Sequence, residues 1–209
     1  MRDENPADTL EKLSILLAQR SYFEQERYNL FKVGYGFDIH KLETGDRDFL
    51  LGGVVIDCDK QVDAISDGDV VIHAIANAIY SAFGEDDIGA HFPPTKYKKE
   101  LEKGHRLSGK EIINDAVKVY LDADYRIGNV VVDIILEKPI LRPYINKIKS
   151  NLAYLLFCSE SAIAIHANTC EGLGSIGKGE AIAVTANIMF TNTTKIKEIF
   201  DYVKSTRTN

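Results

Sequence analysis

Alternating apolar residues predict the first strand of the chain, over residues 32–40. The apolar side chains recur at every second position, at Val33, Tyr35, Phe37 and Ile39. This period of two is typical of a strand with one buried face. Asp38 and His40 are also two residues apart, so we expect their side chains to project from the same face of the strand.

A long apolar run predicts a helix over about 67–83. Ser66 and Asp67 are good N-caps for this helix. Its first turns contain His73, which could there meet Asp38 and His40 at the strand end.

One carboxylate and two imidazoles on a rigid strand and helix suit a zinc site. Asp38, His40 and His73 would supply three ligands and leave the fourth tetrahedral position open, as catalytic zinc requires. A lone histidine in an apolar helix is, however, more often a core residue than a ligand. Asp67 and Asp69 favour the zinc interpretation, because they have no apolar role and concentrate negative charge at the helix start.

The remaining pattern interleaves strands and helices. Residues 84–107 contain glycines, prolines and a lysine- and glutamate-rich centre, and we expect them to form a long loop that is functional or mobile. The other predicted elements are a strand from Phe49 to Ile56 interrupted by Gly52-Gly53, a helix opened by the capping box Ser108–Glu111 and ending near Asp122, a strand over 128–137 covered on both faces, a helix starting at Pro143, strands over 162–168 and 181–190, and a helix over 194–204.

These elements predict an α/β fold of the α+β type. A chain of 209 residues with 45% apolar composition can bury one core, so we expect a single domain with a mixed β-sheet covered by helices on one face. The domain would span 32–192, between an N-terminal extension, 1–31, and a C-terminal tail, 193–209. Leucines at helical spacing predict a short amphipathic helix in the extension, at Leu10, Leu13, Leu16 and Leu17.

Composition argues against several classes of partner. A formal charge of −6 without a basic patch argues against nucleic-acid binding. No apolar run approaches the roughly 20 residues that span a bilayer, so we expect no membrane partner and a soluble protein. Three cysteines without metal-like spacing indicate reduced thiols. The extension is acidic, unlike a transit peptide, although it could be the remainder of a longer leader.

Several motifs occur together in a fixed order. They are Gly34-Tyr35-Gly36-Phe37-Asp38-Ile39-His40, Ser66-Asp67-Gly68-Asp69 with His73, Asp87-Ile88-Gly89 with Phe92-Pro93, Thr169-Cys170-Glu171-Gly172-Leu173-Gly174, and Gly177-Lys178-Gly179-Glu180. Together they resemble the family of 2-C-methyl-D-erythritol 2,4-cyclodiphosphate synthases, enzymes of the non-mevalonate isoprenoid pathway. The resemblance covers about residues 32–192.

The resemblance implies a phosphorus–oxygen lyase. The family converts 4-diphosphocytidyl-2-C-methyl-D-erythritol 2-phosphate to 2-C-methyl-D-erythritol 2,4-cyclodiphosphate and CMP. It works as a homotrimer with each active site between adjacent subunits. Zinc would bind Asp38, His40 and His73, and Glu171 would hold Mg²⁺ or Mn²⁺. Such a reaction between anionic groups depends mainly on charge neutralisation and alignment.

The resemblance also implies a set of substrate contacts. Thr169 would steady the transition state, Asp87 and Gly89 would hold the methylerythritol hydroxyls, and the segment 136–142 would cradle cytosine. Lys178 would lie near the trimer axis. The complete implied substrate-binding set is Asp38, His40, Ser66, Asp87, Gly89, Phe92, Lys96, Leu136, Leu141, Arg142, Asn168, Thr169, Glu171, Ser175 and Lys178.

The chain departs from the family pattern around the phosphates. Ile65 stands where the family has a catalytic histidine, and Ile140 replaces a lysine. Lys96 lies in a loop that is usually acidic, and Ser175 stands where an aromatic residue is common. Losing one preorganised donor costs on the order of 10²–10³ in rate.

Two functions therefore stay open. One is a working synthase, and the other is a catalytically weak or inactive trimer that binds metal and a nucleotide or isoprenoid diphosphate. A zinc hydrolase would need a general base, for which Glu171 is the candidate, and the other motifs argue against it. A plastid stroma is the expected compartment in a eukaryote, and the cytoplasm in a bacterium.

Overall fold

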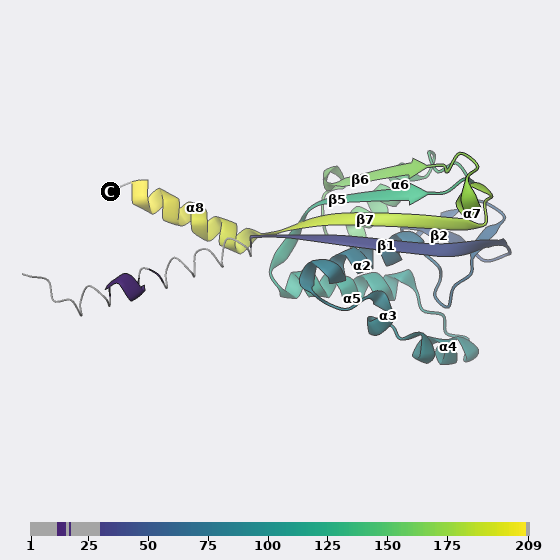
Figure 1. Ribbon diagram of the computed structural model, residues 1–209, viewed down its shortest axis with the longest axis horizontal. Helices are drawn as coiled ribbons and strands as arrows, with labels where there is room; N and C mark the ends of the chain where they lie inside the picture. Colours follow the sequence, from purple (N-terminus) through teal and green to yellow (C-terminus); the bar gives the residue numbers. More distant parts are fainter. Residues whose placement is uncertain (1–11, 16, 18–29, 208–209) are drawn as a thin grey trace, which may run out of the picture. The chain divides into compact units, whose positions relative to one another are not determined.

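A five-stranded sheet organises the larger part of the chain (Figure 1). The computed structural model describes residues 12–15, 17 and 30–207. One compact unit comprises 32–191, and the described residues before and after it belong to a second unit. Among the described residues, no helix is both long and apolar enough to cross a membrane.

The sheet is mixed, as predicted. Its strand order is β4-β1-β7-β5-β6. The two pairings at its edges run in opposite senses: β5 is parallel to β6, with Val130 opposite Ile163, and β1 is antiparallel to β4, with Leu42 opposite Val62. The strands are β1 (Phe31–Thr44), β4 (Lys60–Val62), β5 (Tyr125–Ile135), β6 (Ile163–Asn168) and β7 (Ala181–Asn192).

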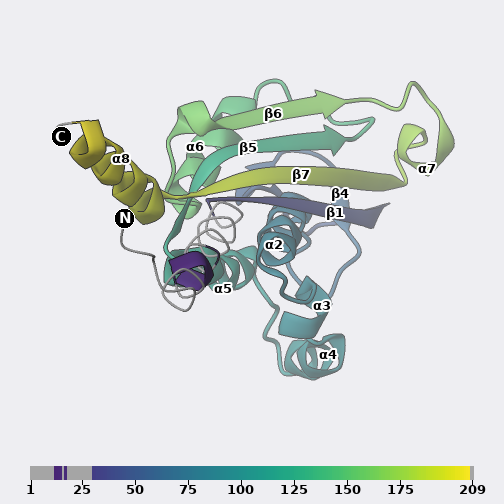
Figure 2. The same cartoon turned by 60° about the vertical axis from the view of Figure 1, so that its left-hand side comes forward.

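Helices cover one face of this sheet, which confirms the expected α+β layering (Figure 2). The covering helices are α2 (Val70–Phe83), α5 (Gly109–Asp122) and α6 (Ile145–Leu155). The helix α2 is buried along most of its length, because its apolar residues face both β1 and α5. The predicted capping box of α5 is present, with Ser108 and Glu111 each bonding the other's backbone N–H.

The two faces of β1 differ from the sequence expectation. Its alternating apolar side chains are exposed in the single chain: Val33 by 71%, Tyr35 by 56%, Phe37 by 46% and Ile39 by 52%. The buried positions are Gly34 and Gly36 instead. A Cβ on either glycine would overlap a backbone carbonyl of α2, at 1.8 Å from Ala78 O and 1.9 Å from Ala74 O. The glycines therefore let α2 pack directly on the strand.

Short elements account for most other differences from prediction. The Gly52-Gly53 interruption is a turn between β2 (Phe49–Leu51) and β3 (Val54–Ile56), which form a separate hairpin. The strand β4 has no sequence counterpart, because three residues carry too little pattern. Outward positions of β5, such as Val131 and Ile135, are half-buried, so only one face of that strand is fully covered.

The segment 84–107 is not a loop throughout. It contains α3 (Ile88–His91) and α4 (Pro94–Glu102). Pro94 occupies the first helical position of α4, where its missing N–H has no cost. The prolines therefore start this helix, whereas the sequence interpretation treated them as breaks.

The remaining short elements are η1 (Glu160–Ala162) and α7 (Gly174–Gly177), and α8 (Thr193–Arg207) corresponds to the predicted terminal helix. Leu10 and Leu16 of the predicted amphipathic helix lie outside the described residues. Leu13 and Leu17 are helical.

Candidate metal and substrate site

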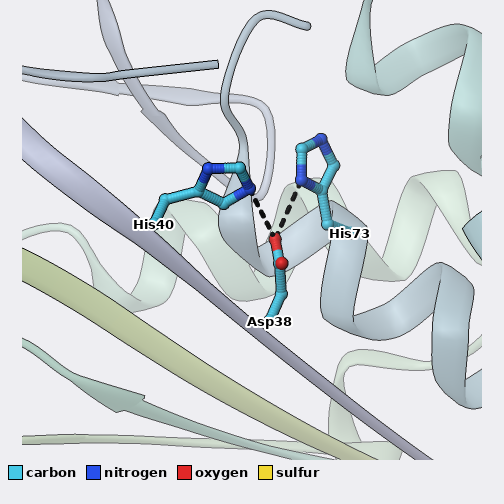
Figure 3. Close-up of side chains that lie close together, drawn as sticks. All are labelled: Asp38, His40 and His73. Atoms are coloured by element: carbon cyan, nitrogen blue, oxygen red, sulfur yellow. Dashed lines mark hydrogen bonds and ion pairs between the residues drawn. The ribbon is translucent and has the colours of Figure 1, made fainter. Parts of the chain in front are cut away.

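Three predicted ligands converge where β1 meets α2 (Figure 3). Asp38 Oδ2 lies 2.9 Å from His73 Nδ1 and 3.2 Å from His40 Nε2. The three ligand atoms all lie within 4.8 Å of one another. Asp38 and His40 share the inward face of β1, as their spacing predicted, but they lie well inside the strand and not at its end.

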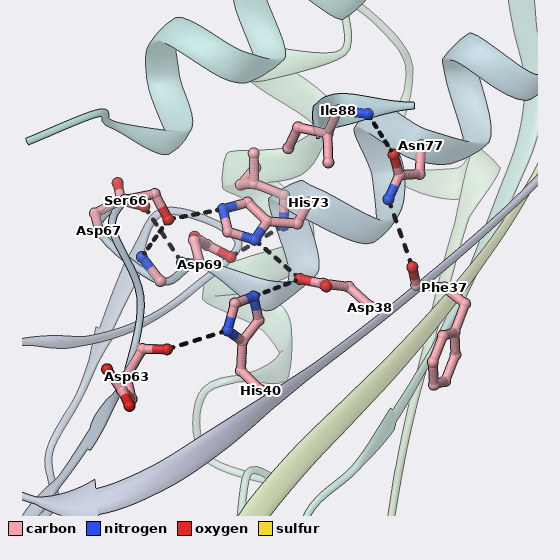
Figure 4. Close-up of polar contacts among 12 residues, drawn as sticks. Phe37, Asp38, His40, Asp63, Ser66, Asp67, Asp69, His73, Asn77 and Ile88 are labelled. Carbon is pink, nitrogen blue, oxygen red and sulfur yellow. Dashed lines mark hydrogen bonds and ion pairs between the residues drawn. The ribbon is translucent and has the colours of Figure 1, made fainter. Parts of the chain in front are cut away.

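The far nitrogen of each imidazole is also held (Figure 4). His40 Nδ1 donates to the backbone oxygen of Asp63 at 3.3 Å, and His73 Nε2 lies 3.1 Å from Ser66 Oγ. Metal-binding histidines usually hydrogen-bond through the nitrogen that faces away from the metal, and this fixes the ring orientation. The arrangement therefore fits a metal bound by Asp38 Oδ2, His40 Nε2 and His73 Nδ1, with an open side for a further ligand.

The electrostatics of the cluster favour a charged carboxylate. Burial alone would raise the pKa of Asp38, but hydrogen bonds and charge interactions with His40 and His73 lower it to about 2. The hydrogen bond that His40 donates to the Asp38 carboxylate is the main cause that raises the pKa of His40. The cluster thus places the ionised oxygen of Asp38 between the imidazoles of His40 and His73. This set of ligands suits a divalent cation.

The start of α2 is fixed by Asp69 and not by Ser66 or Asp67. Asp69 is the N-cap and accepts the backbone N–H of Ile72, while its second oxygen accepts that of Gly53. Asp67 instead accepts the backbone N–H of Gly109 at 2.6 Å. Both aspartates lie at the start of α2, as expected. Their carboxylates accept backbone N–H groups, and neither residue is among the described members of the Asp38–His40–His73 cluster.

A cavity of about 300 Å³ opens beside the cluster. Asp38, His40 and His73 line it themselves, together with Ile65, Ser66 and Gly89 of α3. The remaining lining is mostly apolar, with Ile88, Phe92, Pro94, Tyr97, Leu107 and Ile112. Ile65 stands where the family resemblance implies a histidine, and its side chain offers no hydrogen-bond donor to this cavity.

The α3–α4 arm, residues 88–102, forms one wall of this cavity. Asn77 of α2 accepts the Ile88 N–H at 3.0 Å, which ties the arm to α2. Lys96 lies with its ammonium 5.0 Å from the centre of the Tyr97 ring, and Tyr97 lines the cavity. Asp87 caps α3 by accepting the Ala90 N–H, and it is absent from the described lining of this cavity.

A second cavity of about 740 Å³ lies at the ends of β5 and β6. Its lining includes Leu136, Leu141, Arg142, Asn168 and Thr169, all of which the family resemblance assigns to substrate. The described linings of the two cavities have no residue in common. Within one chain, the metal cluster and the second cavity are therefore separate.

The last implied residues are exposed around α7. Thr169 Oγ1 donates to Glu171 Oε1 at 2.9 Å, and Glu171 has a positive φ of 51°. Glu171 is not among the described residues of the Asp38–His40–His73 cluster. Ser175 and Lys178 lie at the start and the end of α7, with both side chains exposed.

Some structural contacts of the site had no sequence signal. The Asp63 contact uses a backbone oxygen, which any residue type would supply. Arg106 donates to two backbone oxygens behind the cavity wall, and nothing in its local sequence distinguishes it from a solvated arginine.

Comparisons with known proteins agree with this geometry. The model of the YgbB family matches residues 31–191. The chain is 38% identical to the chloroplastic 2-C-methyl-D-erythritol 2,4-cyclodiphosphate synthase of Arabidopsis thaliana, over 76% of this chain and 66% of that protein. It is 35% identical to the synthase of Salinibacter ruber, over 74% of this chain and 95% of that protein. A bifunctional IspD/IspF enzyme of Erythrobacter litoralis is 42% identical, over 74% of this chain, which spans only 39% of that enzyme's length.

Solved structures show the same fold. IspF of Plasmodium falciparum in complex with CDP superposes with a TM-score of 0.68 at 32% identity, covering 78% of this chain and 97% of that one. These matches confirm the family resemblance and support the synthase activity, a lyase reaction, and none of those described here favours an inactive binding protein. The chain therefore belongs to the YgbB family, the family of the 2-C-methyl-D-erythritol 2,4-cyclodiphosphate synthases.

Proposed function

We propose that this chain converts 4-diphosphocytidyl-2-C-methyl-D-erythritol 2-phosphate to the 2,4-cyclodiphosphate and CMP. The observation that carries the proposal is the convergence of Asp38, His40 and His73, with both outer imidazole nitrogens already bonded. The reaction closes a ring within one substrate, so no protein nucleophile is needed. The chain has to hold two mutually repelling phosphates in line.

Asp38, His40 and His73 would hold Zn²⁺, and Glu171 would hold Mg²⁺ or Mn²⁺. A bound cation supplies Lewis-acid polarisation of a phosphoryl oxygen and offsets charge that develops during transfer. The residues fit zinc because two nitrogens and one carboxylate oxygen are its usual ligands. Thr169 would add a hydroxyl donor to phosphate, and its contact with Glu171 keeps both side chains on one short turn.

The second cavity would bind the cytidine part of the substrate. Its volume of about 740 Å³ suits a nucleoside, and residues 136–137 and 139–142 are part of its lining. A related structure contains CDP, which supports a cytidine nucleotide as ligand. Leu136 and Leu141 would contact the base, and Arg142 and Asn168 would contact its polar edge or the ribose. Asp87, Gly89 and Phe92 would bind the methylerythritol end, on the side of the metal cavity.

A homotrimer would bring the two separate cavities together. The exposed stripe of Val33, Tyr35, Phe37 and Ile39 is an apolar surface of the kind that marks a protein interface. We propose that copies of the chain pack against one another through this face. The metal cavity of one copy then meets the nucleotide cavity of the next, with Ser175 and Lys178 near the symmetry axis.

Lys96 would compensate for Ile65. The Ile65 side chain in the cavity lining has no hydrogen-bond donor, whereas the ammonium of Lys96 lies beside Tyr97, another residue of that lining. A cation at the cavity mouth attracts phosphate by direct charge interaction, which the lost histidine would otherwise contribute.

The direct test is CMP release from the diphosphocytidyl substrate in the presence of zinc and magnesium. The wild-type chain should turn over, and His73→Ala should lose at least about 10³-fold in kcat, because removing one of three ligands leaves an incomplete site. His105→Ala is the matched control, since His105 is an exposed histidine that contacts Glu111. A wild-type chain that binds zinc but releases no CMP would contradict the proposal.

The compartment follows from the relatives only in outline. They include both chloroplastic plant enzymes and bacterial enzymes. We propose the plastid stroma if the source is a eukaryote, and the cytoplasm if it is a bacterium.

A further inference from the structure

The segment 63–66 holds both histidines of the metal cluster. Asp63 contributes its backbone oxygen to His40, and Ser66 contributes its hydroxyl to His73. These residues belong to no helix and lie beyond the end of β4. The Asp63 N–H still donates to the Lys41 oxygen of β1 at 3.1 Å, but the pairing of β1 with β4 does not extend to residues 64–66. Something else must set the position of this segment if the imidazoles are to keep their orientation.

Arg106 supplies two of its anchors. The Arg106 Nη1 atom donates to the backbone oxygen of Ala64 at 2.6 Å and to that of Ser66 at 2.8 Å. These two carbonyls flank Ile65, and all four residues of the segment 63–66 line the metal cavity. Charge-assisted bonds of this kind are roughly twice as strong as neutral ones.

Further contacts beside Arg106 join residues 106–109 to residues 64–67, and this set of contacts is called the brace. Ser66 pairs with Leu107 in an isolated parallel bridge, and the Asp67 N–H donates to the Leu107 oxygen at 2.8 Å. The Asp67 carboxylate accepts the Gly109 N–H at 2.6 Å. Residues 106–109 therefore contact 64–67 at several points, and they also lead into the N-terminus of α5.

We propose that Arg106 is a positioning residue of the metal site, which orients His40 and His73 through the segment 63–66 without touching metal or substrate. The inference rests on the proposed function, because it assumes that the three ligands act on a metal. It assigns a role to a residue that is neither one of the three ligands nor part of the described linings of the metal cavity and the second cavity.

The chain offers a matched control in Arg47. Arg47 and Arg106 line the same cavity of about 290 Å³, on the far side of this wall. Arg47 donates to the backbone oxygen of Val62 at 2.9 Å and to the Gln61 side chain, so it also binds backbone carbonyl. Its contacts stop at β4, however, and do not reach the residues that touch the histidines.

Zinc affinity, measured by competition with a chromophoric chelator, is the decisive readout. Arg106→Met keeps the aliphatic stem and loses both bonds, and it should weaken zinc binding about tenfold, as is typical when partners of ligands are removed. Arg47→Met should bind zinc as the wild type does. Arg106→Lys should lie between them, because one ammonium nitrogen can donate to both carbonyls but has a shorter reach.

A double-mutant cycle separates positioning from general destabilisation. Ser66→Ala removes the contact to His73 directly and should itself weaken zinc about tenfold. If Arg106 acts through Ser66, the double variant should fall clearly short of the roughly 100-fold product of the single effects. Urea unfolding of each apo variant shows whether lost stability, in place of lost orientation, explains any change.

The inference is overturned if Arg106→Met binds zinc within about twofold of wild type, if Arg47→Met weakens zinc equally, or if the effects of Arg106 and Ser66 multiply in full. Should Arg106→Met not fold, Arg106→Lys and its cycle with Ser66→Ala give the same decision. CMP release reports separately on the proposed function. If the wild-type chain releases no CMP but the zinc affinities of the variants follow the expected order, the proposed function is wrong and the positioning role of Arg106 stands.

Discussion

The two faces of β1 have opposite characters. The inward face carries Gly34 and Gly36, followed by Asp38 and His40, and it lies directly against α2. The outward face carries four large apolar side chains that are about half to three-quarters exposed in the single chain. One strand thus carries two of the candidate metal ligands on its inward side and exposed apolar side chains on its outward side.

The difference shows what one chain can complete alone. The inward face is finished by α2, whose backbone contacts the glycines and whose His73 meets the ligands of the strand. The apolar side chains of the outward face would become buried only against a second surface, such as another copy in the proposed trimer. Changes at Gly36 and Tyr35 each affect one face of β1, whereas changes at Lys96 and Ser81 affect the cavity and the contact between β1 and α2.

Gly36→Ala should have the largest effect on the folded chain. The added Cβ would lie 1.9 Å from Ala74 O, and overpacking against a backbone atom costs about 3 kcal/mol of unfolding free energy. Ala74 follows His73, so the displaced helix should also weaken zinc binding. Val33→Ala on the outward face is the control and should change apo stability by less than about 0.5 kcal/mol, as measured in urea. Equal losses would contradict the distinction between the faces.

Tyr35→Glu should break the assembly while sparing the fold. Its side chain is 56% exposed in the single chain, so the unfolding free energy of a monomer should hardly change. A charge buried in an apolar interface lacks a partner, and dissociation should become at least about 100-fold easier. Sedimentation at several concentrations measures this. Val55→Glu is the control. Val55 is an exposed residue of β3, outside the five-stranded sheet, and its substitution should leave the oligomeric state unchanged. A wild-type chain that stays monomeric would refute the trimer.

Lys96→Ala should raise KM about fivefold with a smaller effect on kcat, since a mobile surface charge contributes chiefly to attraction of the phosphates. The effect should shrink as salt is added. Lys98→Ala in the same helix is the matched control. Identical kinetics for Lys96→Ala and wild type would show that the cavity tolerates Ile65 without this substitute.

Ser81→Ala should have the smallest effect. Ser81 Oγ accepts the Tyr35 N–H at 3.0 Å and lies 2.8 Å from the Tyr35 oxygen, at a part of β1 where the short β4 provides no described pairing. Losing these bonds should cost about 1 kcal/mol in urea unfolding. Unchanged stability would show that water replaces the hydroxyl at this edge without loss.

The sequence predicted the site better than its surroundings. A spacing of two on a strand and a histidine early in an apolar helix suffice to bring Asp38, His40 and His73 together, because regular elements have fixed geometry. The apolar stripe of β1 was assigned to the core because alternation indicates a buried face without saying whether the same chain buries it. Gly34 and Gly36 belong to a sequence motif, and in the structure they form the contact of β1 with α2.

The arm and the brace could not be predicted for different reasons. In 84–107, charged residues and prolines obscured α4, whose short length gives little periodicity. Arg106 acts through backbone carbonyls, and such contacts depend on how two distant segments meet. The roles proposed for Glu171, Ser175 and Lys178 depend on the proposed trimer, so the structure of one chain does not test them.

The backbone contact at Gly34 and Gly36 also bears on how selectively a small molecule could bind this chain. The ligands sit on two elements whose main chains touch, so their mutual distances leave little room for sequence change. The cavity wall, by contrast, is made of side chains from Ile65 and the α3–α4 arm. A compound that bound a metal at Asp38, His40 and His73 would therefore depend on a geometry that the backbone fixes, whereas one that extended toward Ile65 and Tyr97 would depend on side chains that can change without moving the backbone.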